Sequence, residues 1–151
     1  PGATLFPYRA LFRSGTIITT SSMAALTPGI VGGAPYSAAK AASYNFMRGV
    51  NSELRGLGIR ASTIIPGEVD TPILEGRPAP PDAAARATMM QPADVAQAIL
   101  FCATTPARTL IEEIVMTPTK PRNMEAEMKV ARRSEERRVG KECRSRGPPY
   151  H

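Results

Sequence analysis

The sequence predicts an α/β fold in which helices alternate with the strands of a parallel sheet. Three short runs with the composition of buried strands, rich in β-branched residues, lie at 16–20, 61–65 and 111–116. Longer segments with apolar residues at helical spacing separate these runs. Alternation of this kind predicts βαβ units, which form a parallel sheet with right-handed crossovers.

The longest predicted helix follows the first strand after a loop. Residues 21–34 are rich in Ser, Gly and Pro, which favours a loop. Pro35 suits the first position of a helix, where its missing N–H costs nothing. The helix is expected to run to about Leu57, where flanking glycines mark its end. Its expected apolar face is formed by Phe46, Met47, Val50, Leu54 and Leu57.

An irregular stretch and two helices are expected between the second and third strands. Pro66 and Gly67 stop the second strand, and four prolines make 71–82 an irregular surface segment. A short helix is predicted over 83–90, and Pro92 opens a further helix. The buried face of that further helix is expected to contain Val95, Ile99, Cys102 and Ala103.

Composition indicates one globular domain with a core. The 151 residues are 42% hydrophobic and contain no apolar run near the ~20 residues that span a bilayer, so no membrane partner is expected. No secretion signal opens the sequence. Cys102 and Cys143 are too few for a disulfide framework and lack metal-ligand spacing. We therefore expect a cytoplasmic location and no bound metal.

Both ends of the sequence resemble translated sequencing adapter. Residues 133–151 match one frame of a common short-read adapter with two departures, and 1–14 match the opposite strand with four. A native charged tail is the ordinary alternative, but matches at both ends in opposite orientations make chance a poor explanation. We expect both flanks to be foreign and to pack against nothing specific, and 15–132 to be the native domain.

Charge argues against a nucleic-acid partner. The formal net charge is +6. Residues 1–14 contribute +2 and 133–151 contribute +3, which leaves +1 for 15–132. A nucleic-acid interface would therefore rest on the two flanks alone.

Three chemically active segments are expected at one edge of the sheet. Ser21 and Ser22 follow the first strand directly, and Pro66–Gly67 follow the second. The connecting helix must begin at that same edge, with Tyr36 in its first turn. Because ligands of open parallel sheets bind outside the carboxyl ends of the strands, these segments should converge on one crevice.

Tyr36 and Lys40 form a candidate acid/base pair. Their i, i+4 spacing places them on one helix face, about a turn apart. A nearby ammonium and a helix N-terminus both favour the phenolate, which would bring a phenol closer to neutral titration. Ser22 could hydrogen-bond a substrate carbonyl. Each motif alone is usually a solvated helix face or a turn, but their order and shared edge favour a functional site.

Three stretches of the sequence resemble the short-chain dehydrogenase/reductase family, in its single-domain branch. They are GTIITTSS at 15–22, YSAAK at 36–40 and PGEVDT at 66–71, and the likeness covers essentially all of 15–132. The resemblance implies the C-terminal half of a Rossmann-like, doubly wound parallel sheet, in an incomplete form.

The resemblance also implies roles for individual residues. Tyr36 would be the catalytic acid/base, Lys40 would bind the nicotinamide ribose and lower the pKa of the tyrosine, and Ser22 would orient the substrate oxygen. Tyr36 and Lys40 would both contact the cofactor. Further cofactor-side residues would be Pro66, Gly67, Val69 and Thr71. The implied activity is hydride transfer between NAD or NADP and a small alcohol or ketone, in a homo-oligomer.

Some features depart from the family pattern. The glycine-rich phosphate loop and an upstream asparagine of the family do not occur in this chain, and Thr19 stands where asparagine is common. The interval from Ser22 to Tyr36 is slightly longer than usual. We therefore expect a catalytic C-terminal half that is inactive by itself, with 71–90 as a substrate lid. An extended-branch epimerase or dehydratase and a non-catalytic cofactor-sensing or scaffold protein are the alternatives.

Overall fold

The computed structural model of this chain describes residues 14–28 and 31–133. Its sheet contains β1 (Gly15–Thr20), β2 (Ile59–Pro66) and β3 (Glu113–Met116), which lie in the order β1-β2-β3. β1 pairs with β2 in parallel, and β2 pairs with β3 in the same way. The predicted α/β fold with a parallel sheet is confirmed.

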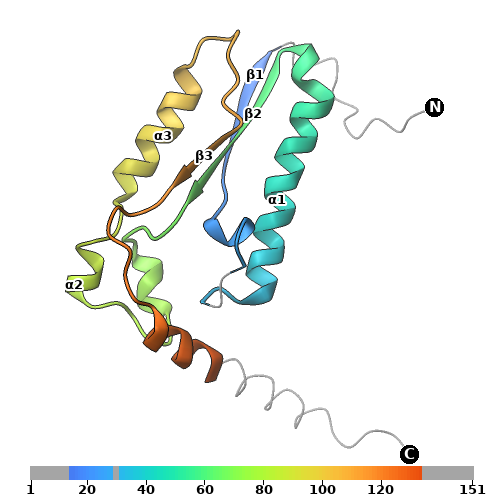
Figure 1. Ribbon diagram of the computed structural model, residues 1–151. Coiled ribbons are helices and arrows are strands. Elements are labelled where there is room, and N and C mark those ends of the chain that lie inside the picture. The colour runs from blue at the N-terminus through green and yellow to red at the C-terminus, as the bar shows by residue number, and fades with distance from the viewer. Residues whose placement is uncertain (1–13, 29–30, 134–151) are drawn as a thin grey trace, which may run out of the picture.

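Two helices cover opposite faces of this sheet (Figure 1). α1 (Gly33–Leu54) joins β1 to β2, and α3 (Pro92–Thr104) lies between β2 and β3 in the chain. Ala61 of β2 packs in a cluster with side chains of α1. The neighbouring Arg60 instead donates to the carbonyl of Thr105, directly after α3. Because successive side chains of a strand point to opposite faces, the two helices lie on different faces.

The two crossovers therefore have opposite hands, since each moves one strand further in the same direction across the sheet. The expectation of right-handed crossovers throughout is wrong for one of them. A right-handed crossover is the usual form, because a right-twisted strand that feeds a right-handed helix packs back onto the sheet only that way. In the second crossover, residues 67–91 separate β2 from α3.

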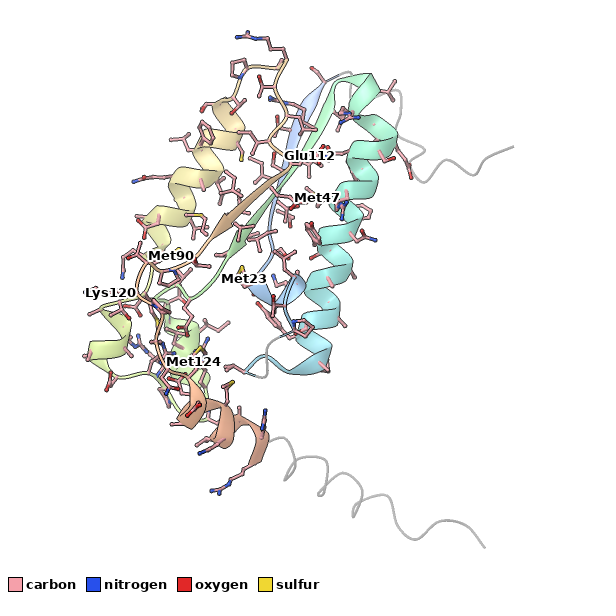
Figure 2. All side chains as sticks on the ribbon, viewed as in Figure 1. Met23, Met47, Met90, Glu112, Lys120 and Met124 are labelled. Atoms are coloured by element: carbon pink, nitrogen blue, oxygen red, sulfur yellow. The ribbon has the colours of Figure 1, made fainter. Side chains whose placement is uncertain are left out.

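Apolar contacts and a buried amide hold α1 on β2. Met47 and Val50 of α1 are buried against Ala61, and Figure 2 shows Met47 on the side of α1 that faces the sheet. The Asn51 carboxamide donates to the carbonyl of Ala61 and accepts from its N–H, both at 2.7 Å. Since Asn51 is also buried, these two bonds fix the register of α1 along β2.

Asn51 also explains why β3 begins later than predicted. The prediction placed the strand from residue 111, but pairing with β2 starts where Glu113 faces Thr63. Two residues earlier on β2, the backbone groups of Ala61 that would continue this ladder are already bonded to Asn51. A side chain therefore takes the place of a strand there.

The boundaries of α1 differ slightly from the prediction. It begins at Gly33, two residues before Pro35, and Gly33 has a positive φ of 74° that favours glycine. After Leu54 the chain continues as a 3₁₀ turn, η2 (Arg55–Leu57), and Gly58 ends it with a φ of 82°. This is the expected role of a glycine after a helix.

The buried faces of both helices are narrower than predicted. Phe46 and Leu57 are exposed, because the stripe that faces the sheet runs through Met47, Val50 and the half-buried Leu54. On α3, Cys102 is buried while Val95 and Ile99 are half-buried, as expected. Ala103 is exposed, contrary to the prediction.

Short turns occupy the segments predicted as irregular. η1 (Met23–Ala25) lies in the predicted loop after β1, and η3 (Pro72–Gly76) lies in the proline-rich stretch. α2 (Ala83–Arg86) is shorter than the predicted helix over 83–90. The Asp82 side chain caps α2 by accepting a hydrogen bond from the N–H of Ala85.

Nearly all of the predicted foreign flanks, 1–14 and 133–151, lie outside the described residues, so their origin stays a prediction. Residues 125–133 are helical and lie beside the segment that holds α2 and η3 (Figure 1). Within the described part of the chain, no helix has the length and apolarity needed to cross a bilayer.

Candidate active site

Ser22, Tyr36 and Lys40 lie near the carboxyl end of β1, and Pro66 and Gly67 lie at the carboxyl end of β2. The two strands run in parallel and pair through Thr20 and Ile64 at this edge. The N–H of Ser21 donates to the carbonyl of Ile64 at 2.8 Å, which extends the pairing past β1. Because α1 starts at the same edge, its first turns lie next to this pair of strand ends.

Two hydrogen bonds join the second turn of α1 to the end of β1. The Lys40 ammonium donates to the carbonyl of Thr20 at 3.2 Å. In the opposite direction, the buried hydroxyl of Ser21 donates to the carbonyl of Lys40, also at 3.2 Å. Lys40 is therefore held at a fixed place beside the end of β1.

Tyr36 lies in the first turn of α1 with 43% of its surface exposed. The Lys40 ammonium is 5.8 Å from the centre of its ring, within the range of a cation–π interaction. The ring also lies over Gly32, so closely that a Cβ there would come within 2.6 Å of the ring atom Cδ1. The position of the tyrosine is thus set by an ammonium and by a glycine.

Ser22 and Ser21 have different tasks. Ser22 caps η1, and its Oγ accepts a hydrogen bond from the N–H of Ala24 at 3.2 Å. A hydroxyl that accepts in this way keeps its proton for a further acceptor. Ser21, by contrast, is buried and directed at α1. Ser22 is half-buried, so of the two serines it is the one that solvent can reach.

The segment after β2 reaches the same edge through the pairing of β1 with β2. Pro66 is buried, and the N–H of Gly67 donates to the carbonyl of Met116 at 2.7 Å. Val69 forms an isolated parallel bridge with Met90. Thr71 is half-buried and caps η3 without a hydrogen bond from its side chain to that turn.

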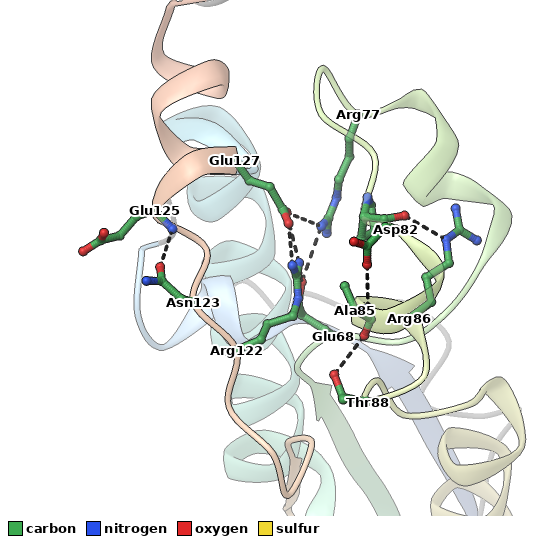
Figure 3. A network of polar contacts seen from close by, with 11 residues as sticks. Glu68, Arg77, Asp82, Ala85, Arg86, Thr88, Arg122, Asn123, Glu125 and Glu127 are labelled. Carbon is green, nitrogen blue, oxygen red and sulfur yellow. Dashed lines mark hydrogen bonds and ion pairs between the residues drawn. The ribbon is translucent and has the colours of Figure 1, made fainter.

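The structure contains a cluster of four charged side chains that the sequence did not predict. Glu68, Arg77, Arg122 and Glu127, here called the ion cluster, come from four separate segments (Figure 3). Only Glu68 lies inside a motif, PGEVDT, where its charge gives no hint of a partner. The other three are scattered surface-type charges whose proximity depends on tertiary structure.

Electrostatics in the ion cluster favour the charged forms. Partial burial alone would raise the pKa of Glu68, but hydrogen bonds and positive charge from Arg122 and Arg77 outweigh it and lower that pKa below its ordinary value. Hydrogen bonds to Glu127 and Glu68 raise the pKa of Arg122. Glu68 and Arg122 are therefore both charged at neutral pH.

A second tyrosine on α1 has a structural contact outside this edge. The hydroxyl of Tyr44 donates to Glu113 of β3 at 2.7 Å, and this hydrogen bond raises its pKa. The Tyr44 ring also lies 5.7 Å from the Arg48 guanidinium carbon. Tyr44 links α1 to β3, whereas the Tyr36 ring lies near Lys40 and over Gly32.

Comparison with known proteins gives a consistent result. The chain matches the sequence profile described as short chain dehydrogenase over residues 4–81, which is more than half of its length. It is 43% identical over 68 residues to 1-deoxy-11-beta-hydroxypentalenate dehydrogenase of Streptomyces exfoliatus, covering 45% of this chain and 24% of that protein.

Solved structures agree with the fold. The closed form of a serine dehydrogenase complexed with NADP+ superposes with a TM-score of 0.60 at 28% identity, covering 72% of this chain and 46% of that one. A 3-oxoacyl-[acyl-carrier protein] reductase with bound NAD from Brucella melitensis gives a TM-score of 0.55 at 28% identity, covering 69% of this chain and 39% of that one. In each comparison the chain spans less than half of the relative's length.

Proposed function

This chain belongs to the short chain dehydrogenase family, and from that premise we propose that it forms the catalytic part of an oxidoreductase that uses NAD or NADP on an alcohol or ketone. The observation that carries the proposal is the placement of Tyr36 beside Lys40, with Lys40 bonded to the end of β1. The nicotinamide nucleotide, when bound, would supply the hydride-transfer chemistry. The longer protein that contains this chain is called the full-length enzyme below.

The residues at the strand ends fit such a cofactor by their chemistry. Lys40 has three N–H donors and uses one on Thr20, so further donors can face a ribose hydroxyl. The Thr71 hydroxyl makes no bond to the turn that it caps, which suits contact with a carboxamide or phosphate. Pro66, Gly67 and Val69 would form the wall on the nicotinamide side.

Proton transfer is assigned to Tyr36. Its hydroxyl would donate a proton to the substrate oxygen during reduction and accept it during oxidation. The positive charge of Lys40 would stabilise the phenolate that remains. Ser22, which accepts from Ala24 and keeps its own proton to donate, would hold the substrate oxygen in place.

Replacement of Tyr36 by Phe in the full-length enzyme tests this assignment. Tyr36→Phe keeps the ring and removes the proton, so kcat should fall by at least ~10²–10⁴-fold, the usual contribution of general acid–base catalysis. Steady-state turnover of a ketone panel with NADH and NADPH measures it. Tyr44→Phe is the matched control, because Tyr44 lies on the same helix and bonds to Glu113 instead. Turnover near the parental rate in Tyr36→Phe would overturn the assignment.

We further propose that 15–132 is the native catalytic half and that 1–14 and 133–151 derive from adapter sequence. The translated match at both ends supports this boundary. The family profile matches from residue 4, which lies inside the proposed N-terminal flank, so the N-terminal boundary needs a test more than the C-terminal one. Sequencing the gene from its source across codons 1–20 and 128–151 tests both. Native DNA that encodes either flank would contradict the proposal at that end.

A further inference from the structure

The segment proposed as the substrate lid leaves the sheet edge and returns to the same place. Val69 and Met90 form a parallel bridge. The N–H of Asp70 donates to the carbonyl of Met90 at 2.8 Å, and the N–H of Met90 donates to the carbonyl of Glu68 at 3.2 Å. A salt bridge of 3.1 Å between Arg86 and Asp70 adds a side-chain contact between the two ends of the segment. Residues 71–89 therefore form a loop with joined ends.

The ion cluster attaches this loop to the chain that follows β3. Arg122 donates to both carboxylate oxygens of Glu68 at 2.7 Å, from Nε and Nη2. It also donates to both carboxylate oxygens of Glu127. Arg122 thus holds the two glutamates side by side, in the two-pronged geometry that guanidinium groups form with carboxylates.

Arg77 joins the cluster from the lid, and its contacts are longer. Its Nη1 atom lies 3.4 Å from Glu68 and 3.7 Å from Glu127. The Arg77 side chain is 26% exposed, against 14% for Arg122. Of the two arginines, Arg77 is therefore the weaker partner and the one that solvent reaches more easily.

From this difference we propose that Arg77 is a positioning residue for substrate binding. It is the latch of the lid, meaning the contact that holds residues 71–89 in place and can be released. Arg122 holds Glu68 and Glu127 together, and these two carboxylates bind Arg77. In the docked state, Arg77 holds the end of η3 against the loop that follows Gly67. In the released state, the loop swings about its joined base at Val69 and Met90. The proposal rests on the proposed function, because that function places the cofactor at 66–71.

Local packing supports a latch at this point of the lid. Arg77 follows η3 directly, and its N–H donates to the carbonyl of Leu74 at 3.2 Å. Leu74 is 2% exposed, whereas Ile73 in the same turn is 80% exposed. The turn is thus anchored by one apolar side chain and one arginine. Pro81 is a further buried residue of the lid, so loss of the arginine contact leaves this side of the lid held by apolar contacts alone.

Arg77→Ala in the full-length enzyme tests the latch by two readouts. Hydrogen exchange of backbone amides in 71–89 should become faster, while exchange in β1 and β2 stays unchanged. KM for the carbonyl substrate should rise about fivefold, as expected for a partly exposed ion pair, with kcat little changed. Arg77→Lys keeps the charge and should recover part of KM. Rising ionic strength should raise KM in the parent and have no such effect in Arg77→Ala.

Arg55→Ala is the matched control. Arg55 forms an exposed salt bridge of 3.6 Å with Glu112, which precedes β3. Its loss should leave exchange in 71–89 and KM at parental values. Unchanged exchange in Arg77→Ala would overturn the latch, and faster exchange with an unchanged KM would overturn its role in substrate binding. If Tyr36→Phe kept its turnover, the proposed function would fail while the exchange result on the latch still stood.

Discussion

At the scale of residues, the structure adds a glycine to the candidate site. The sequence predicted Tyr36 and Lys40 from their spacing, and the structure places them together. No pattern in the sequence singles out Gly32, because glycines are ordinary in the loop before a helix. Its importance comes from the Tyr36 ring, which lies back over the helix N-terminus, the direction that long side chains take in helices.

We predict that Gly32→Ala impairs catalysis in the full-length enzyme. The new Cβ would lie 2.6 Å from Cδ1 of Tyr36, so the ring must move. A displacement of about 1 Å at a reacting group can cost ~10²-fold in rate, and kcat should fall to that extent. Thermal stability should change little, since Gly32 has a φ of −90° that alanine accepts.

Gly49→Ala provides the comparison for that experiment. Gly49 also lies on α1, and a Cβ there would meet nothing within 4 Å. This change should leave kcat unaltered and stabilise the helix by about 0.5–1 kcal/mol, the usual difference between the two residues. Parental kcat in Gly32→Ala would show that the ring is not fixed by that glycine.

At the scale of elements, local signals predicted which elements exist better than where they end. Pro35, Pro92 and the glycines around Leu57 correctly marked helix termini within a few residues. The start of β3 could not be predicted, because it depends on Asn51, fifty or more residues earlier in the chain. An asparagine on a helix gives no sign in the sequence that it will replace a strand partner.

We predict that Asn51→Ala destabilises the α1–β2 unit. The change removes two buried hydrogen bonds and leaves the N–H and C=O of Ala61 without these partners. Unsatisfied buried groups of this kind cost about 2–4 kcal/mol for the pair, which should appear as a lower urea midpoint in the full-length enzyme. Asn45→Ala changes an exposed position on the same helix and should alter the free energy of unfolding by no more than ~0.5 kcal/mol, so the urea midpoint should stay close to the parental value.

At the scale of the whole molecule, alternation of strand and helix patterns was enough to predict the parallel sheet. The expected right hand was wrong for one of the two crossovers, because their helices cover opposite faces while both connections move in the same direction across the sheet. The ion cluster was also unpredictable. Its four members lie up to 59 positions apart, from Glu68 to Glu127, and only the folded lid brings them together.

The described fold exposes apolar side chains on its sheet and on α3. Ile17 of β1 is 47% exposed and Val115 of β3 is 51% exposed, and on α3 Leu100 and Phe101 exceed 60%. Within the described residues, β1 pairs with β2 alone, so its other edge presents unpaired backbone groups. Edges and patches of this kind promote association between molecules.

We therefore predict that this chain, expressed by itself, is poorly soluble and binds no dinucleotide. The sequence contains no G-x-G-x-x-G turn, so the usual backbone cradle for a pyrophosphate at a helix N-terminus is not encoded in it. Lys40 and Thr71 would provide only a few contacts against the entropy lost on binding. Titration of the refolded chain into NADH or NADPH should leave the nucleotide fluorescence unchanged, whereas the full-length enzyme should alter it. Saturable binding at micromolar nucleotide, or turnover of any ketone by the chain alone, would show that these 151 residues hold the cofactor without further protein.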